Sequence, residues 1–246
     1  MSESGDAMTR RRSLLWPSVW AAGAFLLLLG LGTWQVQRLS WKEGLIAARH
    51  AAVTGAPTAL PQSLDAAKAL EYHRVRVTGR FANDRELYLG ATSRDGRAGY
   101  QVITPLRLGD GATLLVNRGF IPQDRKAPES RSAGELSGEI TVTGLLRLPP
   151  QGKPHWFIPA NSAERNYWIY VDIPAMAAAA HIENVLPFYV DADATPNPGG
   201  LPLGGQTLLE LPNDHLQYAI TWYALAAALV VIYILFVRRH RQGAPA

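Results

Sequence analysis

The chain has 246 residues, enough for one core-forming domain together with membrane segments. It contains no cysteine and only three methionines. This composition excludes disulfides, thiolate metal ligands, covalent c-type haem attachment and a thioether copper shuttle. The net charge of +4 resides at the two ends, +1 in the head through Arg12 and +3 in the tail after Val237. The balanced segment between them lacks the basic excess of a nucleic-acid-binding domain, so we expect no nucleic-acid partner.

Two long uncharged segments predict membrane spans. Neither 14–36 nor Tyr218 to Val237 contains a charged residue. Each has close to the roughly 20 apolar residues that cross a bilayer, and each carries Trp or Tyr near its ends, as interfacial belts do. We therefore predict transmembrane helices over 14–36 and 215–237.

A cleaved signal peptide is the alternative for the first segment. Its apolar run is longer than the roughly 7–15 residues of a signal core, and no small-residue cleavage site follows it. The basic clusters Arg10–Arg12 and Arg238–Arg241 predict cytoplasmic ends, because clustered Arg and Lys flanking a span are retained there. We expect a bacterial inner membrane protein. Its cytoplasmic tails would be 1–13 and 238–246, around a periplasmic domain over 37–214.

Residues that end one helix and begin another mark the start of the intervening domain. The first helix is expected to continue to about Ala52, because Gly55 and Pro57 then interrupt it. Ser63 is a suitable N-cap for a short helix over 64–70.

The pattern then changes to a period of two, which predicts strands. Tyr72 to Phe81 alternates apolar with polar residues, and 86–90 is its expected hairpin partner. Asp110-Gly111 predicts a hairpin turn, since Asp-Gly readily adopts positive φ. Further strands are expected at 100–108, 112–117, 139–148, 168–171 and 187–190, with a helix over 172–180. The predicted fold class is an α+β membrane protein: two transmembrane helices flank an antiparallel sheet or barrel-like domain with one or two short helices.

Standard catalytic signatures are missing from the sequence. It has no G-x-S-x-G elbow, zinc-binding H-E-x-x-H, P-loop or dinucleotide fingerprint, so we expect no enzymatic activity. Of the six histidines, His215 differs by its position at the non-cytoplasmic mouth of the second span. On a helix it shares a face with Tyr218, Trp222 and Leu225.

His215 therefore has two interpretations. An imidazole beside aromatic and small residues at a membrane boundary suits an axial haem ligand, and Ala219 and Ala226 would allow a flat ligand or the other helix to approach. The alternative is an interfacial histidine that hydrogen-bonds water or a lipid headgroup. On the first helix, Trp34, Arg38 and Trp41 share a face near the same boundary. Arg38 could bind a haem propionate, a lipid headgroup or Asp214.

Six stretches in order carry a resemblance to a known family. They are GTWQVQRLSWK (32–42), YHRVRVTGRF (72–81), GYQVITPL (99–106), NRGFIP (117–122), FYVDADA (188–194) and NDHLQYAITWYALA (213–226). Together they resemble the Surfeit-locus cytochrome c oxidase assembly family over nearly the whole chain between the two tails. Each stretch is modest alone, but the ordered set is specific.

The resemblance implies an accessory factor that assists haem a insertion into the catalytic subunit of cytochrome c oxidase. Haem a synthase is a second candidate partner. Bacterial members are reported to bind haem a with a histidine at the start of the second span, which matches His215. Trp34, Arg38, Tyr218 and Trp222 are the other expected haem-contacting residues. A scaffold that stabilises an oxidase subunit without binding haem is the alternative function.

The stretch Asn117-Arg118-Gly119 also has two interpretations. Its residues could brace the sheet, with Gly119 supplying a turn conformation, or Arg118 could contact the oxidase subunit. The same two interpretations, bracing of the sheet or contact with the oxidase subunit, apply to Tyr100, Pro105, Asp191 and Asp193.

Overall fold

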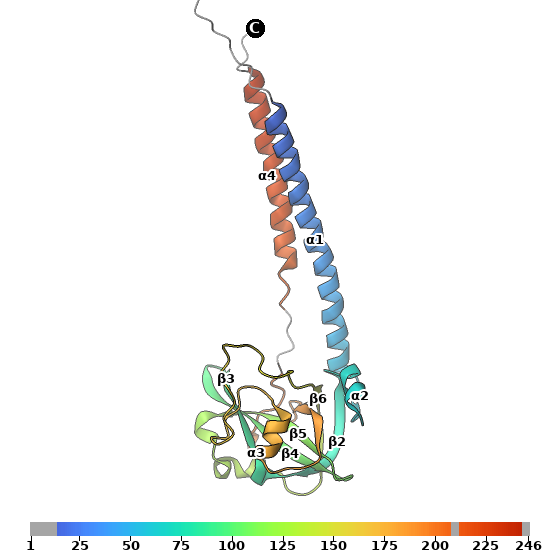
Figure 1. Ribbon diagram of the computed structural model, residues 1–246, viewed down its shortest axis with the longest axis vertical. Helices are drawn as coiled ribbons and strands as arrows, with labels where there is room; N and C mark the ends of the chain where they lie inside the picture. Colours follow the sequence, from blue (N-terminus) through green and yellow to red (C-terminus); the bar gives the residue numbers. More distant parts are fainter. Residues whose placement is uncertain (1–13, 208–211, 243–246) are drawn as a thin grey trace, which may run out of the picture. The chain divides into compact units, whose positions relative to one another are not determined.

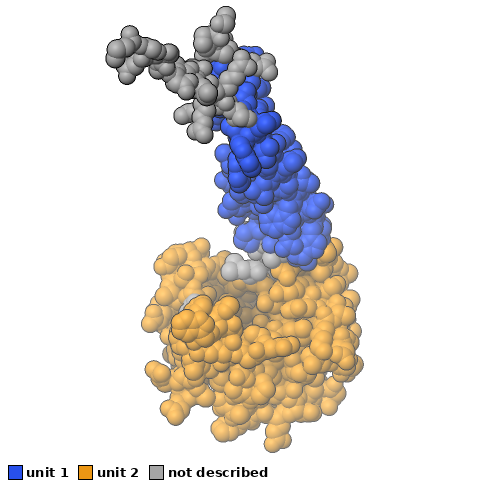
Figure 2. Space-filling model, turned by 45° about the horizontal axis from the view of Figure 1, so that its top comes forward, with its two compact units in different colours: residues 1–47, 210–246 blue, residues 48–209 orange. Residues whose placement is uncertain are grey.

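A computed structural model of the chain describes residues 14–207 and 212–242 (Figure 1). The chain divides into two compact units, one of residues 1–47 with 210–246 and one of residues 48–209 (Figure 2). The predicted basic cluster Arg10–Arg12 lies outside the described residues, as does the side chain of Arg241.

Two helices are long and apolar enough to cross a membrane, α1 over Leu15–Thr54 and α4 over His215–Gln242. The expected continuation of the first helix to about Ala52 is confirmed, because α1 runs without a break to Thr54. Arg238 and Arg239 are exposed in the last turns of α4. The span limits 14–36 and 215–237 remain predictions.

The two helices pack as an antiparallel pair with a seven-residue repeat. The less exposed positions follow alternating spacings of three and four, which is the pattern of a helix–helix seam. Small residues lie at most of its buried points: Ala219 and Ala226 are each 2% exposed, and the ring of Tyr223 occupies the space beside Gly32. The seam contains Phe25, Leu28, Gly32, Gln35 and Leu39 on α1, and His215, Ala219, Trp222, Ala226, Leu229 and Tyr233 on α4.

The other unit is built on a seven-stranded sheet that closes into a barrel. The order is β1-β2-β6-β7-β5-β4-β3, and an additional pairing of β2 with β4 closes it. Most pairings are antiparallel, as expected, but β1–β2 and β5–β7 are parallel. The strands are β1 Thr58–Ala59, β2 Arg74–Phe81, β3 Leu87–Arg94, β4 Arg97–Leu108, β5 Thr113–Pro122, β6 Ile140–Arg147 and β7 Val185–Ala192.

Short helices complete the domain. Ser63 caps α2 (Leu64–Ala69) by accepting a hydrogen bond from the Ala66 amide, as predicted. Asp172 caps α3 (Ile173–Ala179) in the same way. Four 3₁₀ helices lie in the connections: η1 Asn83–Arg85, η2 Gln123–Arg125, η3 Pro128–Gly134 and η4 Pro198–Gly200.

Two strand predictions are wrong. Residues 87–90 of the predicted segment 86–90 begin β3, but β3 pairs with β4 through the turn at Asp95-Gly96 and not with β2. The positive φ of both turn residues suits a tight hairpin there, whereas η1 redirects the chain after β2. Residues 168–171 form no strand, since Trp168 makes only an isolated bridge to Leu89. The aromatic side chain of Trp168 is instead buried in the core.

Two large apolar clusters stabilise the barrel on its two sides, and a smaller one contains Tyr88, Val102 and Ile121. One lies between the strands, where the alternation of β2 directs Val75 and Val77 inward against Leu114 and Phe188. The other packs α3 against the outside of the sheet and is centred on the fully buried Trp168. The period-two prediction is therefore confirmed over 74–81, whereas Tyr72, with φ +66°, lies before the strand.

We predict that Gly119→Ala destabilises the domain by about 2–3 kcal/mol, because positive-φ strain and a steric clash add. Gly119 has φ +114°, and an added Cβ would lie 1.8 Å from the Leu203 carbonyl oxygen. Gly111→Ala is the matched control, since Gly111 has φ +86° with nothing within 4 Å. Chemical unfolding of both variants checks this. Equal losses would mean that the Leu203 contact relaxes without cost.

Candidate functional site

His215 is the first residue of α4, and its side chain is bound to α1. The ring Nδ1 lies 2.7 Å from Oε1 of the buried Gln35. An amide oxygen can only accept a hydrogen bond, so Nδ1 carries the proton. In the neutral imidazole the lone pair then resides on Nε2, which is the atom available to bind a metal.

The position of Gln35 explains this contact. Gln35 falls on the seam of α1, three residues after Gly32, in an otherwise apolar stripe. A polar side chain buried between two apolar helices is stabilised when it hydrogen-bonds to the opposite helix. His215 supplies that partner. The two helices thereby fix the orientation and the tautomer of the imidazole.

The residues of α4 that were predicted to share a face with His215 lie on two different surfaces. Trp222 follows His215 on the seam and is half-buried, whereas Tyr218 and Leu225 lie on the exposed flank. Ala219 and Ala226 are buried against α1, so the other helix, and not a flat ligand, occupies the space beside them.

The predicted residues of α1 lie near the seam but outside it. Trp34 is exposed, and the guanidinium of Arg38 lies 4.5 Å from the centre of the Trp41 ring. The structure thus brings His215 to Gln35, while Arg38 lies against Trp41. Sequence reasoning missed Gln35 because it followed the aromatic residues. The alternating spacing of Gly32, Gln35 and Leu39 was the signal that could have identified it.

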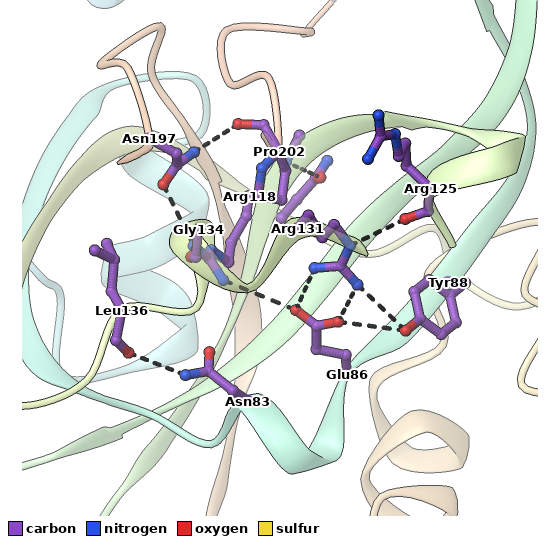
Figure 3. Close-up of polar contacts among 12 residues, drawn as sticks. Asn83, Glu86, Tyr88, Arg118, Arg125, Arg131, Gly134, Leu136, Asn197 and Pro202 are labelled. Carbon is purple, nitrogen blue, oxygen red and sulfur yellow. Dashed lines mark hydrogen bonds and ion pairs between the residues drawn. The ribbon is translucent and has the colours of Figure 1, made fainter. Parts of the chain in front are cut away.

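A second polar site lies inside the β-rich unit (Figure 3). The carboxylate of Glu86 accepts hydrogen bonds from Arg131 at 2.5 and 3.1 Å, and a second guanidinium, that of Arg118, lies 3.8 Å away. The side chains of Glu86 and Arg118 are each 2% exposed. Tyr88 donates a hydrogen bond to Glu86 at 3.3 Å. Burial and the adjacent Glu86 carboxylate raise the pKa of Tyr88 to about 12.

A β-bulge directs Arg118 into this network. On β4 and β5, Val102 pairs with Gly119 and the next residue, Ile103, pairs with Asn117. Arg118 is therefore the extra, unpaired residue of β5 at the bulge. Its guanidinium donates to the Gly134 carbonyl and to Asn197 Oδ1, and it lies over the ring of Phe81. A buried, multiply bonded side chain braces the domain and is not available to a partner. The structure thus favours the bracing interpretation of Arg118.

A third polar cluster surrounds Asp191, close to where the chain enters and leaves the domain. Asp191 accepts hydrogen bonds from Arg147, Asn117 and Thr207 at 2.8–2.9 Å. Burial and the neighbouring Asp191 raise the pKa of Tyr189 above its usual value. These contacts are internal to the domain, which gives Asp191 a bracing role as well.

The arrangement of potential ligands limits the chemistry. Within 14–207 and 212–242, no three His, Asp or Glu side chains form a group that could bind a metal ion. Nε2 of His215 makes no hydrogen bond to another residue that the structure describes, and a single such imidazole suits a metal that brings most of its own ligands.

Comparison with known proteins identifies the family. The model of the SURF1 family matches residues 22–227. Surfeit locus protein 1 of Mus musculus is 42% identical over 236 residues, which cover 87% of this chain and 76% of the mouse protein. The protein of that name from Takifugu rubripes is 41% identical, over 83% of this chain and 92% of the fish protein. The one from Homo sapiens is 40% identical, over 88% of this chain and 75% of the human protein. The chain belongs to the SURF1 family, which confirms the resemblance in its sequence.

Proposed function

We propose that this chain is an assembly factor for cytochrome c oxidase that binds haem a through His215 and assists its insertion into the catalytic subunit. Membership of the SURF1 family supports the role in oxidase assembly. The haem-binding step rests on one observation above all, the 2.7 Å contact between His215 Nδ1 and Gln35. The factor acts without catalytic turnover of its own.

The contact with Gln35 is the arrangement that a haem ligand needs. A ligating histidine usually donates its other ring N–H to an oxygen acceptor, which fixes the ring and raises its basicity. Gln35 provides that acceptor and leaves Nε2 for the iron. Trp34, Tyr218 and Trp222 would supply aromatic surface for the haem, and Arg38 would hold a propionate from the α1 side.

A single imidazole ligand suits a carrier that must release its haem better than it suits a permanent haem site. Haem a is a largely apolar molecule, so its passage between membrane proteins requires a shielded intermediate site. A single neutral imidazole of this chain would hold the iron and still allow its release, whereas two strong protein ligands would retain it. Haem a synthase would be the donor, and the oxidase catalytic subunit the acceptor.

The proposed location is a bacterial inner membrane with the β-rich domain in the periplasm. The two apolar helices, α1 and α4, support membrane anchoring. Arg238 and Arg239 at the end of α4 support a cytoplasmic C-terminus, because basic residues flanking a span are retained in the cytoplasm.

The test is the haem a content of the full chain purified from membranes that make haem a. His215→Ala is expected to abolish the haem a band in the reduced-minus-oxidised spectrum. His50→Ala, which removes an exposed histidine of α1, should leave it unchanged. Gln35→Leu should weaken haem binding by about 10–100-fold, as loss of the partner of a ligand does.

The matched control for Gln35 is Thr33→Val. It removes another hydrogen bond between the helices, that of Thr33 with Tyr223 at 3.2 Å, without touching His215. Its haem content should equal that of the wild type. A colourless wild type that still supports oxidase assembly would support the scaffold function instead.

A further inference from the structure

The loop 148–160, here called the aromatic loop, presents large apolar side chains to solvent. Trp156 is 90% exposed and Phe157 is 66% exposed. The same domain buries Trp168 completely, so a tryptophan at the surface does not reflect a lack of core. Exposed aromatic residues grouped on one loop are typical of a surface that another phase or molecule covers.

The rings at the tip contact each other. His155 stacks on Phe157 with centroids 5.3 Å apart, and Trp156 meets Phe157 edge-on at 5.9 Å. Lys153 donates a hydrogen bond to the Trp156 carbonyl oxygen at 3.2 Å. Four prolines at 149, 150, 154 and 159 further restrict the backbone. These contacts and the prolines restrict the conformations of the tip, which lowers the entropy cost of binding.

The base of the aromatic loop lies where the chain enters and leaves the domain. Arg147, just before the loop, lies over the ring of Tyr72, and Arg49 of α1 lies over the same ring. Arg147 also binds Asp191, which accepts a hydrogen bond from Thr207. One connected cluster thus joins the base of the loop to the segments that lead to both helices.

The composition of the loop matches a lipid surface. Trp and Phe with a neighbouring Lys form the combination that is enriched where proteins meet headgroups. The loop contains no acidic residue, so an anionic leaflet would not repel it. A tethered domain also meets its own bilayer at high effective concentration.

We propose that the aromatic loop inserts Trp156 and Phe157 into the interfacial layer of the bilayer that the two helices cross, and thereby docks the domain on the membrane. This contact requires membrane anchoring, which is part of the proposed function, but it does not require haem.

The absence of native cysteine allows a single-site test. The full chain carrying His155→Cys is labelled with an environment-sensitive fluorophore. It is placed, without haem, in nanodiscs of phosphatidylcholine with a minor fraction of phosphatidylglycerol. Asp84→Cys is the matched control. Asp84 is exposed and lies just after the end of β2, at the opposite end of that strand from Arg74.

The label at 155 is expected to be quenched severalfold more than the label at 84 by nitroxide-bearing lipids, and to be shielded from aqueous iodide. Adding Trp156→Ser and Phe157→Ser should return it to the level of the control. If labelling at 155 lowers the unfolding midpoint of the domain, Gln151→Cys replaces it. A loop label as open to iodide as the control would overturn the proposal and indicate a protein partner for the loop. Because no haem is present, this failure is distinct from failure of haem binding.

Discussion

Replacing Glu86 by Ala is expected to destabilise the β-rich domain by about 3–5 kcal/mol, because it leaves the buried guanidinium groups without their counter-charge. Glu86 is the carboxylate that faces both Arg131 and Arg118. It also accepts the hydrogen bond of Tyr88. The loss would be a large fraction of the roughly 5–15 kcal/mol that stabilises a typical domain.

Chemical unfolding of the full chain in detergent measures this loss. Asp65→Ala is the matched control, since Asp65 forms an ion pair with Lys68 at 2.8 Å on the surface. That variant should unfold at the same denaturant concentration as the wild type, because exposed pairs contribute little. Unfolding of Glu86→Ala at the wild-type concentration would contradict the bracing role of the network.

Replacing Trp168 by Ala is expected to cost a comparable amount, about 3–5 kcal/mol, through the cavity it leaves. Trp168 is fully buried between α3 and the sheet, beside Met176. Its indole N–H also donates to Asn166 Oδ1 at 3.1 Å. The variant should therefore loosen α3 as well as lower the unfolding midpoint.

Trp156→Ala provides the comparison, because it removes the same side chain from a position that is 90% exposed. In detergent, its unfolding midpoint should remain near that of the wild type. Equal losses for the two variants would show that the packing around Trp168 contributes nothing specific. Native-state hydrogen exchange of the α3 amides gives a second measurement of the same effect.

The sequence predicted those features that depend on local chemistry. The apolar segments, the Ser63 cap and the turn before β5 each rest on a few adjacent residues, and each is present in the structure. The partner of β3 was predicted wrongly, because pairing depends on residues far apart in the chain. The closure of the barrel through β2 and β4 has the same long-range origin.

The candidate site was only partly predictable for a similar reason. His215 stands out by its position and by the family resemblance, but the role of Gln35 depends on which face of α1 meets α4. Arg118 could equally have been an exposed contact residue. The bulge that buries it arises from the slip between β4 and β5, which the sequence does not reveal.

The most direct test of the central claim is a titration of haem a into the full chain purified without haem, with His215→Ala in parallel. The wild type is predicted to saturate at a fixed ratio of haem to protein and to develop a defined reduced-minus-oxidised band. The variant is predicted to show only unsaturable partition into detergent. Identical titration curves for the two proteins would contradict the assignment of His215 as the haem ligand.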